Sequence, residues 1–296
     1  LARHARSKGL YVNLLTNGVL VDESNASEIV EVVTSVSLSL DSAHCEEHDA
    51  MRGKDSWGKV LRAIRLLREA GLQFLHLNSV VTPVNKNSVA EFLEFAWDEL
   101  NAQKVTLAPT GMDVPDSSGK RGAREHMLSP EDMWTVYEAQ RKFQHRKATE
   151  HPPIVSRNSL RRTHCGVGNG LVSIDSNGDL YPCQTMHVPE LRCGNAFQTS
   201  LREVLETSGL LHSLRNMTVD LLEDCPTCPM RYVCNGGCRM EAYTREGRLN
   251  ARNRDLCPLF FTRALDKLWM TANLPVDQHG TVSGRQAPLD FFESYA

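Results

Sequence analysis

The stretch from Asp224 to Cys238 constrains this chain more than any other part of it. It reads Asp-Cys-Pro-Thr-Cys-Pro-Met-Arg-Tyr-Val-Cys-Asn-Gly-Gly-Cys, which places thiols at Cys225, Cys228, Cys234 and Cys238 in the spacing C-x2-C-x5-C-x3-C. Two cysteines separated by two residues can turn onto one metal ion or cluster, and the prolines and glycines suit the tight turns required. The pattern therefore predicts a metal site.

Thiols outside this stretch extend the pattern. Eight of the nine cysteines lie between positions 165 and 257, where Cys165 and Cys183 form C-x12-G-x4-C around Gly178 and Cys257 follows the dense run. A disulfide framework is typical of short secreted chains, and these residues show no secretory segment. Thiolates suit zinc and iron alike, but seven thiols without closely spaced histidines fit two four-iron clusters at least as well as two zinc ions.

The order of these seven cysteines resembles the SPASM domain, which carries two auxiliary 4Fe-4S clusters in radical S-adenosylmethionine (SAM) enzymes. The ligands of the two clusters interleave along the chain in that family. The resemblance implies one cluster on Cys225, Cys228, Cys234 and Cys257, and a second on Cys165, Cys183 and Cys238.

The second set is one thiolate short. Some family members have a further cysteine a few residues after the first, but this chain reads Gly166-Val-Gly-Asn-Gly170 there. We therefore expect either an open iron site, which a substrate atom could occupy, or a ligand from Cys193 or His187. Because free cysteine packs as a small hydrophobe, we favour a core position for Cys193.

The first half of the chain alternates between strand and helix patterns. We expect strands at 10–16, 36–40, 74–81 and 104–108, and helices at 1–8, 24–33, 55–71, 88–100 and 130–147. Alternating strands and helices of this length predict parallel βα units. The charged stretch 41–54 is expected to be a loop, and Asp55 or Ser56 to cap the helix after it.

The second half predicts little regular structure. Apolar runs at 171–174 and 180–181 flank Asp175-Ser-Asn-Gly178, which predicts a β-hairpin because its Asn-Gly pair tolerates positive φ. Helices are expected at 200–208 and 258–272.

Four segments of the first half resemble the third to fifth βα units of a radical SAM partial barrel: Leu15-Thr-Asn-Gly18, Ser37-Leu-Ser-Leu-Asp41, His48-Asp-Ala-Met-Arg-Gly53 and Leu66-Leu-Arg-Glu-Ala-Gly71. The expected fold class is α/β, an incomplete radical SAM (β/α) partial barrel followed by a loop-rich SPASM iron-sulfur domain with a hairpin and helices. We expect barrel residues at 1–110, a linker and helix at 111–155, the SPASM domain at 156–272 and a tail at 273–296.

The resemblance also implies a cluster that binds SAM through a C-x3-C-x2-C loop, and these residues contain no such triplet. Because the chain begins at Leu1 and not at methionine, we expect the loop upstream, within about two βα units or on the order of 60 residues. The 296 residues alone are predicted to be inactive.

Five residues remain as candidate SAM contacts. Ser39 at a strand end and Arg52 in the following loop are placed to hold the SAM carboxylate or ribose, and Asp41 the ribose. Thr16 and Asn78 lie near strand ends that would face a barrel mouth. For each of them a structural hydrogen bond, a turn or a solvated loop is the alternative.

A further cluster, His44-Cys-Glu-Glu-His48, invites a zinc interpretation. The second position is a cysteine where the H-E-x-x-H motif needs glutamate, and no third ligand is evident. We therefore expect a surface loop there and no metal.

The resemblance implies chemistry on peptides or proteins by hydrogen abstraction, with SAM, a third 4Fe-4S cluster and an electron donor such as flavodoxin or ferredoxin. We favour maturation of a ribosomally made peptide through a thioether or carbon-carbon crosslink. Sulfatase maturases of the family have an aspartate as proton acceptor where this chain has Gln184, so formylglycine formation would need Tyr181 or His187 instead. A noncatalytic iron-sulfur or zinc scaffold is the rival from another class.

Composition sets the remaining limits. A net charge of −3 and 41% apolar residues describe an ordinary soluble protein, with neither nucleic acid nor membrane expected as a partner. No apolar run approaches the ~20 residues of a membrane-spanning helix. Nine cysteines without a recognisable signal peptide indicate a reducing cytoplasm.

Overall fold

The structure, a computed structural model, describes residues 1–110, 126–150, 162–252, 254 and 256–272, and it divides into two units. One unit contains the described residues 1–110 and 128–150, and the other contains 162–252, 254 and 256–272 together with 126–127. The helix expected within 111–155 thus belongs to the first unit. The expected tail, 273–296, lies outside the described residues.

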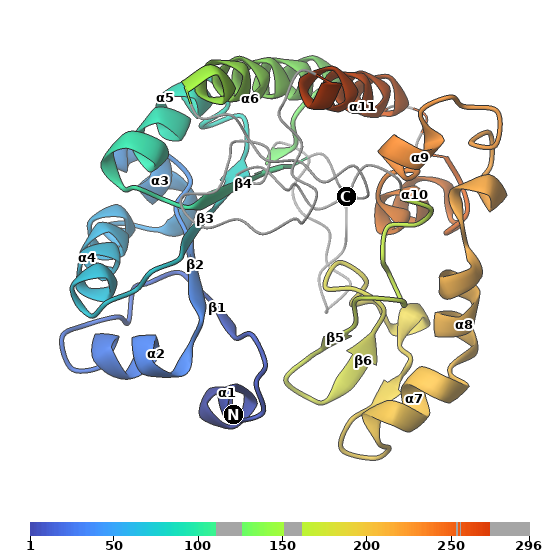
Figure 1. Ribbon diagram of the computed structural model, residues 1–296, viewed down its shortest axis with the longest axis horizontal. Helices are drawn as coiled ribbons and strands as arrows, with labels where there is room; N and C mark the ends of the chain where they lie inside the picture. The colour runs from blue at the N-terminus through green and yellow to red at the C-terminus, as the bar shows by residue number, and fades with distance from the viewer. Residues whose placement is uncertain (111–125, 151–161, 253, 255, 273–296) are drawn as a thin grey trace. The chain divides into compact units, whose positions relative to one another are not determined.

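The first unit is built on a four-stranded parallel sheet (Figure 1). Its strands follow chain order and are β1 (Asn13–Thr16), β2 (Ser35–Ser39), β3 (Leu75–Val81) and β4 (Lys104–Pro109). All three neighbouring pairs are parallel. The predicted strands are confirmed, although β1 begins three residues later than expected.

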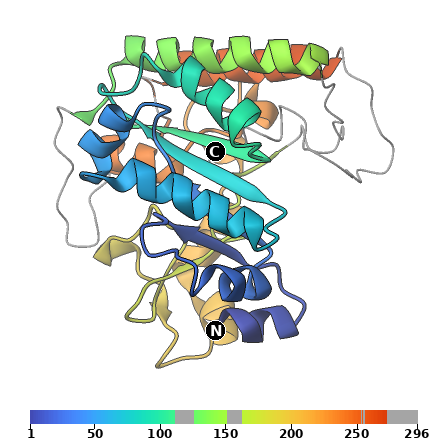
Figure 2. The ribbon, with the colours of Figure 1, turned by 90° about the vertical axis from the view of Figure 1, so that its left-hand side faces the viewer.

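Helices precede, connect and follow these strands. They are α1 (Ala2–Ser7), α2 (Ala26–Val32), α3 (Cys45–Arg52), α4 (Ser56–Glu69), α5 (Val89–Glu94) with its π-helical continuation η1 (Phe95–Glu99), and α6 (Pro130–Glu150). Figures 1 and 2 show α2 to α5 on one face of the sheet. Five of the six helices were predicted, and the strand-helix alternation is that of the expected α/β fold.

The two faces of the sheet differ in chemistry. Leu38, Leu75 and Leu77 are fully buried, and Gly18 packs between Leu38 and helix α4, which places the apolar face under the helices. The alternate positions of the strands carry polar side chains, among them Ser37 and His76. This sheet therefore has one apolar face, under the helices, and one face with polar side chains.

The prediction of a loop at 41–54 was wrong, because α3 occupies Cys45–Arg52. Although the sequence of α3 is mostly polar, one of its side chains is buried. This is His48, whose Nδ1 accepts a hydrogen bond from the backbone N–H of Asp41 at 3.1 Å. His44 precedes the helix, and its Nε2 lies 2.5 Å from a carboxylate oxygen of Glu91. The two histidines therefore have separate protein partners.

The cap of α4 also differs from the expectation. Neither Asp55 nor Ser56 caps the helix with its own side chain. Instead the Asp49 carboxylate, from α3, accepts hydrogen bonds from the backbone N–H groups of Asp55 at 2.7 Å and Trp57 at 2.8 Å. These N–H groups lower the pKa of Asp49, the Trp57 bond most strongly. One helix thus caps the next.

The second unit has a three-stranded antiparallel sheet and short helices. The predicted hairpin is formed by β5 (Ser173–Ile174) and β6 (Asp179–Tyr181), and β7 (Gly194–Asn195) pairs with β6. The predicted helices are α7 (Leu201–Thr207) and α11 (Cys257–Ala272). Elements not predicted are β7, α8 (Gly209–Asn216), α9 (Arg231–Cys234), α10 (Arg239–Glu246) and the 3-10 turns η4 (Pro189–Leu191) and η5 (Val219–Leu221).

Two apolar clusters form the core of this unit. The first contains Val167, Met186, Val188, Leu191, Leu214 and Met240. The second contains Leu180, Val204 and Leu211. Cysteines border both clusters, so the core also positions the thiols. In the part of the chain that the structure describes, no helix is long and apolar enough to cross a bilayer.

Candidate metal centres and cofactor site

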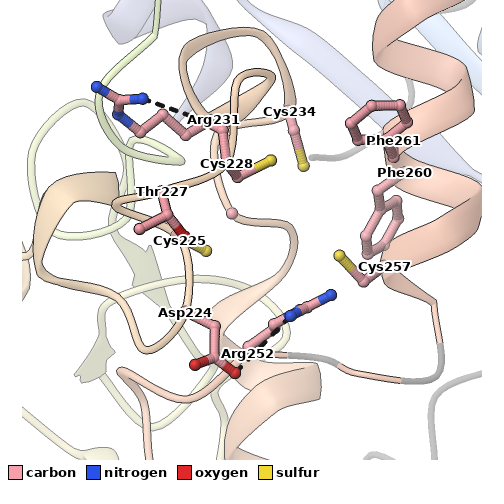
Figure 3. A pocket seen from close by; sticks show the side chains of 11 residues that line it. Asp224, Cys225, Thr227, Cys228, Arg231, Cys234, Arg252, Cys257, Phe260 and Phe261 are labelled. Carbon is pink, nitrogen blue, oxygen red and sulfur yellow. Dashed lines mark hydrogen bonds and ion pairs between the residues drawn. The ribbon is translucent and has the colours of Figure 1, made fainter.

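Four thiols surround one cavity of about 210 Å³ in the second unit (Figure 3). They belong to Cys225, Cys228, Cys234 and Cys257, and the rings of Phe260 and Phe261 complete the lining on the side of α11. Figure 3 shows sulfur atoms facing this space from different sides, with Cys257 opposite Cys225. These are the four residues that the resemblance assigned to one cluster.

Local backbone geometry explains how a short stretch supplies three of these thiols. Cys225 and Cys228 lie in a turn closed by the Cys228 N–H, which donates to the Cys225 carbonyl at 2.9 Å, and Cys234 ends α9. Asn235, Gly236 and Gly237 follow, all with left-handed φ between 64° and 81°. This run turns the chain before Cys238, which is why glycine is needed here.

The distribution of the four thiols around one cavity suits an iron-sulfur cluster. Among the described residues, no group of three or more His, Cys, Asp or Glu side chains is close enough to hold one metal ion. A zinc site needs four ligands converging at roughly 2.0–2.3 Å on one point. In a 4Fe-4S cluster each thiolate binds a different iron, so sulfurs spread around a cavity suit it.

The remaining thiols of the pattern gather elsewhere in the same unit. Cys165, Cys183 and Cys238 all pack against the first apolar cluster. Burial raises the pKa of the Cys165 and Cys238 thiols, and the nearby Cys183 thiol raises both further. These three residues are the set that the resemblance assigned to the second cluster.

The two candidates for a fourth ligand have protein contacts of their own. Cys193 packs against the second apolar cluster, and its thiol points to the Leu191 carbonyl at 3.6 Å. The His187 ring stacks on Tyr181 with 4.4 Å between ring centroids, and its Nε2 lies 2.9 Å from the Ser173 hydroxyl. The identity of the fourth ligand stays a prediction.

The candidate proton acceptors lie around Cys183. The Cys183 thiol is 3.5 Å from the Gln184 amide oxygen. Tyr181 is buried, and burial raises the pKa of its phenol, as do Asp179 and Asp175. The structure therefore brings Tyr181 and His187 together, while Gln184 is engaged with a thiol. Their catalytic roles stay predictions.

In the first unit, two of the candidate SAM contacts bind each other. The Arg52 guanidinium donates to the Asp41 carboxylate from Nε at 2.5 Å and Nη2 at 3.0 Å. The carboxylate also accepts from the Val80 N–H at 2.8 Å, and its side chain is fully buried. Arg52 ends α3 and does not lie in a loop as expected. Any contact of this pair with SAM stays a prediction.

Ser39 and Thr16 end their strands, as expected, whereas Asn78 lies in the middle of β3. Ser39 of β2 is opposite Asn78 of β3 in the parallel register. The buried Oδ1 atom of Asn78 has no hydrogen-bond partner within the described residues. The Thr16 hydroxyl accepts from the Gly18 N–H at 3.1 Å and so stabilises the turn after β1. The structure thus brings Ser39 and Asn78 together.

A row of polar side chains across the sheet was not predicted. The Asn13 amide donates to the Ser37 hydroxyl at 3.0 Å, which lies 3.0 Å from Nδ1 of His76, whose Nε2 lies 2.8 Å from the Thr106 hydroxyl. Burial and, to a lesser extent, the charge of Lys104 lower the pKa of His76 to about 4, so this ring is neutral at pH 7. Polar residues alternating with leucine along β3 were the signal that could have revealed it.

Sequence profiles of two families match the two units. The radical SAM superfamily matches residues 1–96, and the iron-sulfur cluster-binding SPASM domain matches residues 165–229. The second match begins at the first cysteine of the seven. The expected order of domains is therefore found.

Characterised relatives match across both regions. An AdoMet-dependent heme synthase of Methanosarcina barkeri is 30% identical over 279 residues, which covers 83% of this chain and 74% of that protein. A PqqA peptide cyclase of Streptomyces rochei is 30% identical over 255 residues, covering 83% and 68%. The mycofactocin maturase MftC of Mycolicibacterium smegmatis is 28% identical over 248 residues, covering 80% and 61%.

A solved structure supports the same fold. The structure of anSMEcpe with bound AdoMet has a TM-score of 0.72 at 23% identity and covers 92% of this chain and 75% of that one. The chain thus spans between 61% and 75% of the lengths of these proteins. With a 30% identical relative matched over most of its length, and with both domain profiles in order, this chain belongs to the radical SAM enzymes that carry a SPASM iron-sulfur domain.

Proposed function

We propose that this chain acts in the maturation of a ribosomally synthesised peptide or protein, by hydrogen abstraction that leads to a thioether or carbon-carbon crosslink. The observation that carries the proposal is the separation of seven thiols into two groups, four around one cavity and three on an apolar cluster. Relatives named mycofactocin maturase and PqqA peptide cyclase support a peptide substrate. So does the fold shared with Streptococcus suis SuiB, solved with its precursor peptide SuiA at a TM-score of 0.62.

Two auxiliary 4Fe-4S clusters would take up and pass on single electrons at potentials set by the surrounding protein. A crosslink removes two hydrogens from the peptide. One leaves as a hydrogen atom with the radical derived from SAM, and the other leaves as a proton together with one electron. The residues around Cys165 and Cys225 would hold the acceptors of that electron, and the ring of Phe260 would line the cavity of the four thiols. Flavodoxin or ferredoxin is the proposed donor for SAM cleavage.

The second thiol group favours thioether chemistry. Only Cys165, Cys183 and Cys238 of the seven-cysteine pattern belong to it, and the alternatives Cys193 and His187 are engaged elsewhere. A cluster held by three thiolates leaves one iron for another ligand, and a substrate sulfur has the right chemistry for it. A substrate cysteine held there would be placed for bond formation to carbon.

Formylglycine formation is the second candidate. A serine-type anaerobic sulfatase-maturating enzyme of Bacteroides thetaiotaomicron is 25% identical over 276 residues, covering 82% of this chain and 64% of that protein. The proton released in that reaction needs a base, and the Gln184 amide cannot serve. The raised pKa of Tyr181 keeps its phenol protonated, so His187, stacked on Tyr181 at 4.4 Å, is the candidate acceptor with a basic nitrogen.

Metal analysis tests the cofactor assignment. After anaerobic reconstitution, the 296-residue chain should hold about eight iron and eight sulfide. The double variant Cys225→Ala/Cys228→Ala should lose about half of both, because it removes two of the four thiols around the cavity. Cys193→Ala is the matched control and should keep the full content. About two zinc ions and no sulfide would contradict the iron assignment and favour the scaffold.

Activity is tested with the purified 296-residue chain and with the gene expressed in cells. The 296 residues contain no C-x3-C-x2-C triplet, so we expect no SAM cleavage by them after reconstitution. Coexpression of the gene with precursor peptides encoded beside it should yield a peptide lighter by two hydrogens that does not react with hydrazides. A hydrazide adduct would indicate a formyl group and support the second candidate, and SAM cleavage without any peptide change would contradict both.

A further inference from the structure

The second unit contains a buried cation that the proposed chemistry has not used. Arg239 opens α10 directly after Cys238 and is only 3% exposed. Its hydrogen bonds within the described residues all go to backbone carbonyl oxygens, which belong to Gly236, Gly237 at 3.4 Å, Leu249 at 3.1 Å and Ala251 at 2.9 Å. Carbonyls orient a guanidinium but carry no net charge to neutralise it.

The position of Arg239 relates it to both thiol groups. Gly236 and Gly237, whose carbonyls it binds, lie between Cys234 of one group and Cys238 of the other. Gly236 also lines the cavity of the four thiols, and Arg239 itself directly follows Cys238 of the three-thiol group. The guanidinium is therefore held next to residues of both groups.

A buried cation without a counter-charge is unfavourable. Deprotonated thiolates on a 4Fe-4S core carry net negative charge, and reduction adds another electron. A fixed positive charge nearby in a medium of low dielectric constant favours the more negative, reduced state. The positive charge of Arg239 would thus offset the negative charge of the two centres when they hold their clusters.

We propose that Arg239 is the shared counter-ion of the two iron-sulfur centres and raises the reduction potential of both. The inference rests on the proposed cofactors and adds a role for this residue. It makes Arg239 a residue that tunes the centres and not a ligand.

The test is a redox titration of the reconstituted 296-residue chain, followed by electron paramagnetic resonance. Arg239→Gln should lower the equilibrium constant for one-electron reduction of both centres about tenfold, which corresponds to about 59 mV. Arg239→Lys keeps the charge and should stay within about twofold of the unsubstituted chain. Arg215→Gln is the matched control, because Arg215 donates to the Gly168 and Leu205 carbonyls in the same unit and its loss should leave both potentials unchanged.

Each outcome decides the inference. Unchanged potentials in Arg239→Gln, or a shift in one centre alone, would overturn a shared counter-ion. If Arg239→Gln holds no iron, the Arg239→Lys variant tests the proposal instead. Full iron content with unchanged potentials in Arg239→Lys supports a role for the positive charge. Loss of iron in Arg239→Lys shows that the hydrogen bonds to the carbonyls matter and not the charge. An unsubstituted chain with fewer than two clusters would refute the proposed cofactors themselves, whereas two clusters with insensitive potentials would refute only this inference.

Discussion

Gly237→Ala tests whether the turn between the two thiol groups depends on the absence of a side chain. Gly237 has a φ of +72°, and a Cβ atom built there would lie 2.8 Å from Cε2 of Phe260. The left-handed conformation costs alanine roughly 1–2 kcal/mol. Overpacking against the ring adds roughly 1–3 kcal/mol. We therefore expect a loss of stability of roughly 2–5 kcal/mol.

Gly247→Ala separates the two contributions. Gly247 follows α10 with a φ of +70°, and an added Cβ atom would meet nothing within 4 Å. It should therefore lose only the conformational part, roughly 1–2 kcal/mol. The difference between the variants measures the contact with Phe260, which lines the cavity of four thiols.

The measurements are thermal unfolding of the reconstituted chain by circular dichroism under anaerobic conditions, and iron content after the same treatment. Gly237→Ala should unfold several degrees below Gly247→Ala, since 1 kcal/mol shifts Tm by roughly 2–4 °C in a protein of 150–250 residues. It should also retain less iron, because the ring of Phe260 has to move at the cavity. Equal unfolding temperatures and equal iron in the two variants would refute the steric argument.

Two further predictions concern the first unit. The folded-state pKa of His76, about 4, lies below its ordinary value of 6.5, so the folded chain binds fewer protons between these values and loses stability as pH falls through this range. At 1.36 kcal/mol per pKa unit the loss approaches roughly 3 kcal/mol, and urea unfolding at pH 7 and pH 4 should show it in the unsubstituted chain but not in His76→Gln. Arg52→Ala leaves the buried Asp41 carboxylate without its cation and should cost roughly 3–5 kcal/mol in the same assay at pH 7. The double variant Asp41→Asn/Arg52→Ala should recover part of this loss of stability. A loss below about 1 kcal/mol in Arg52→Ala would contradict a structural role for the ion pair and favour a role of Arg52 in binding SAM.

The cysteine pattern predicted which four thiols lie around one cavity, because three of them are close together in the sequence. The C-x2-C turn of Cys225 and Cys228 needs only neighbouring backbone, and the glycines before Cys238 mark left-handed positions. The strands could likewise be predicted from runs of apolar residues. Each of these features depends on residues close in sequence, which a single sequence displays.

Features that depend on contacts between residues distant in the sequence could not be predicted from it. Helix α3 consists mainly of polar residues and depends on His48, which bonds the end of β2, and on Asp49, which caps α4. Helices α9 and α10 are short, and their ends are set by packing and not by propensity. Arg239 is one of many arginines in the sequence, and only the fold shows that it is buried beside thiols.

The interleaving of the two thiol groups has a consequence for folding. Cys234 and Cys238 are separated by three residues yet belong to different groups, and Cys257 joins the first group from a later helix. Neither centre can therefore form from one contiguous segment, and each closes a long loop whose entropy is lost on metal binding. Because the link between Cys234 and Cys238 also holds the guanidinium of Arg239, the two centres share their central support. Loading of one centre should thus order the link and favour loading of the other.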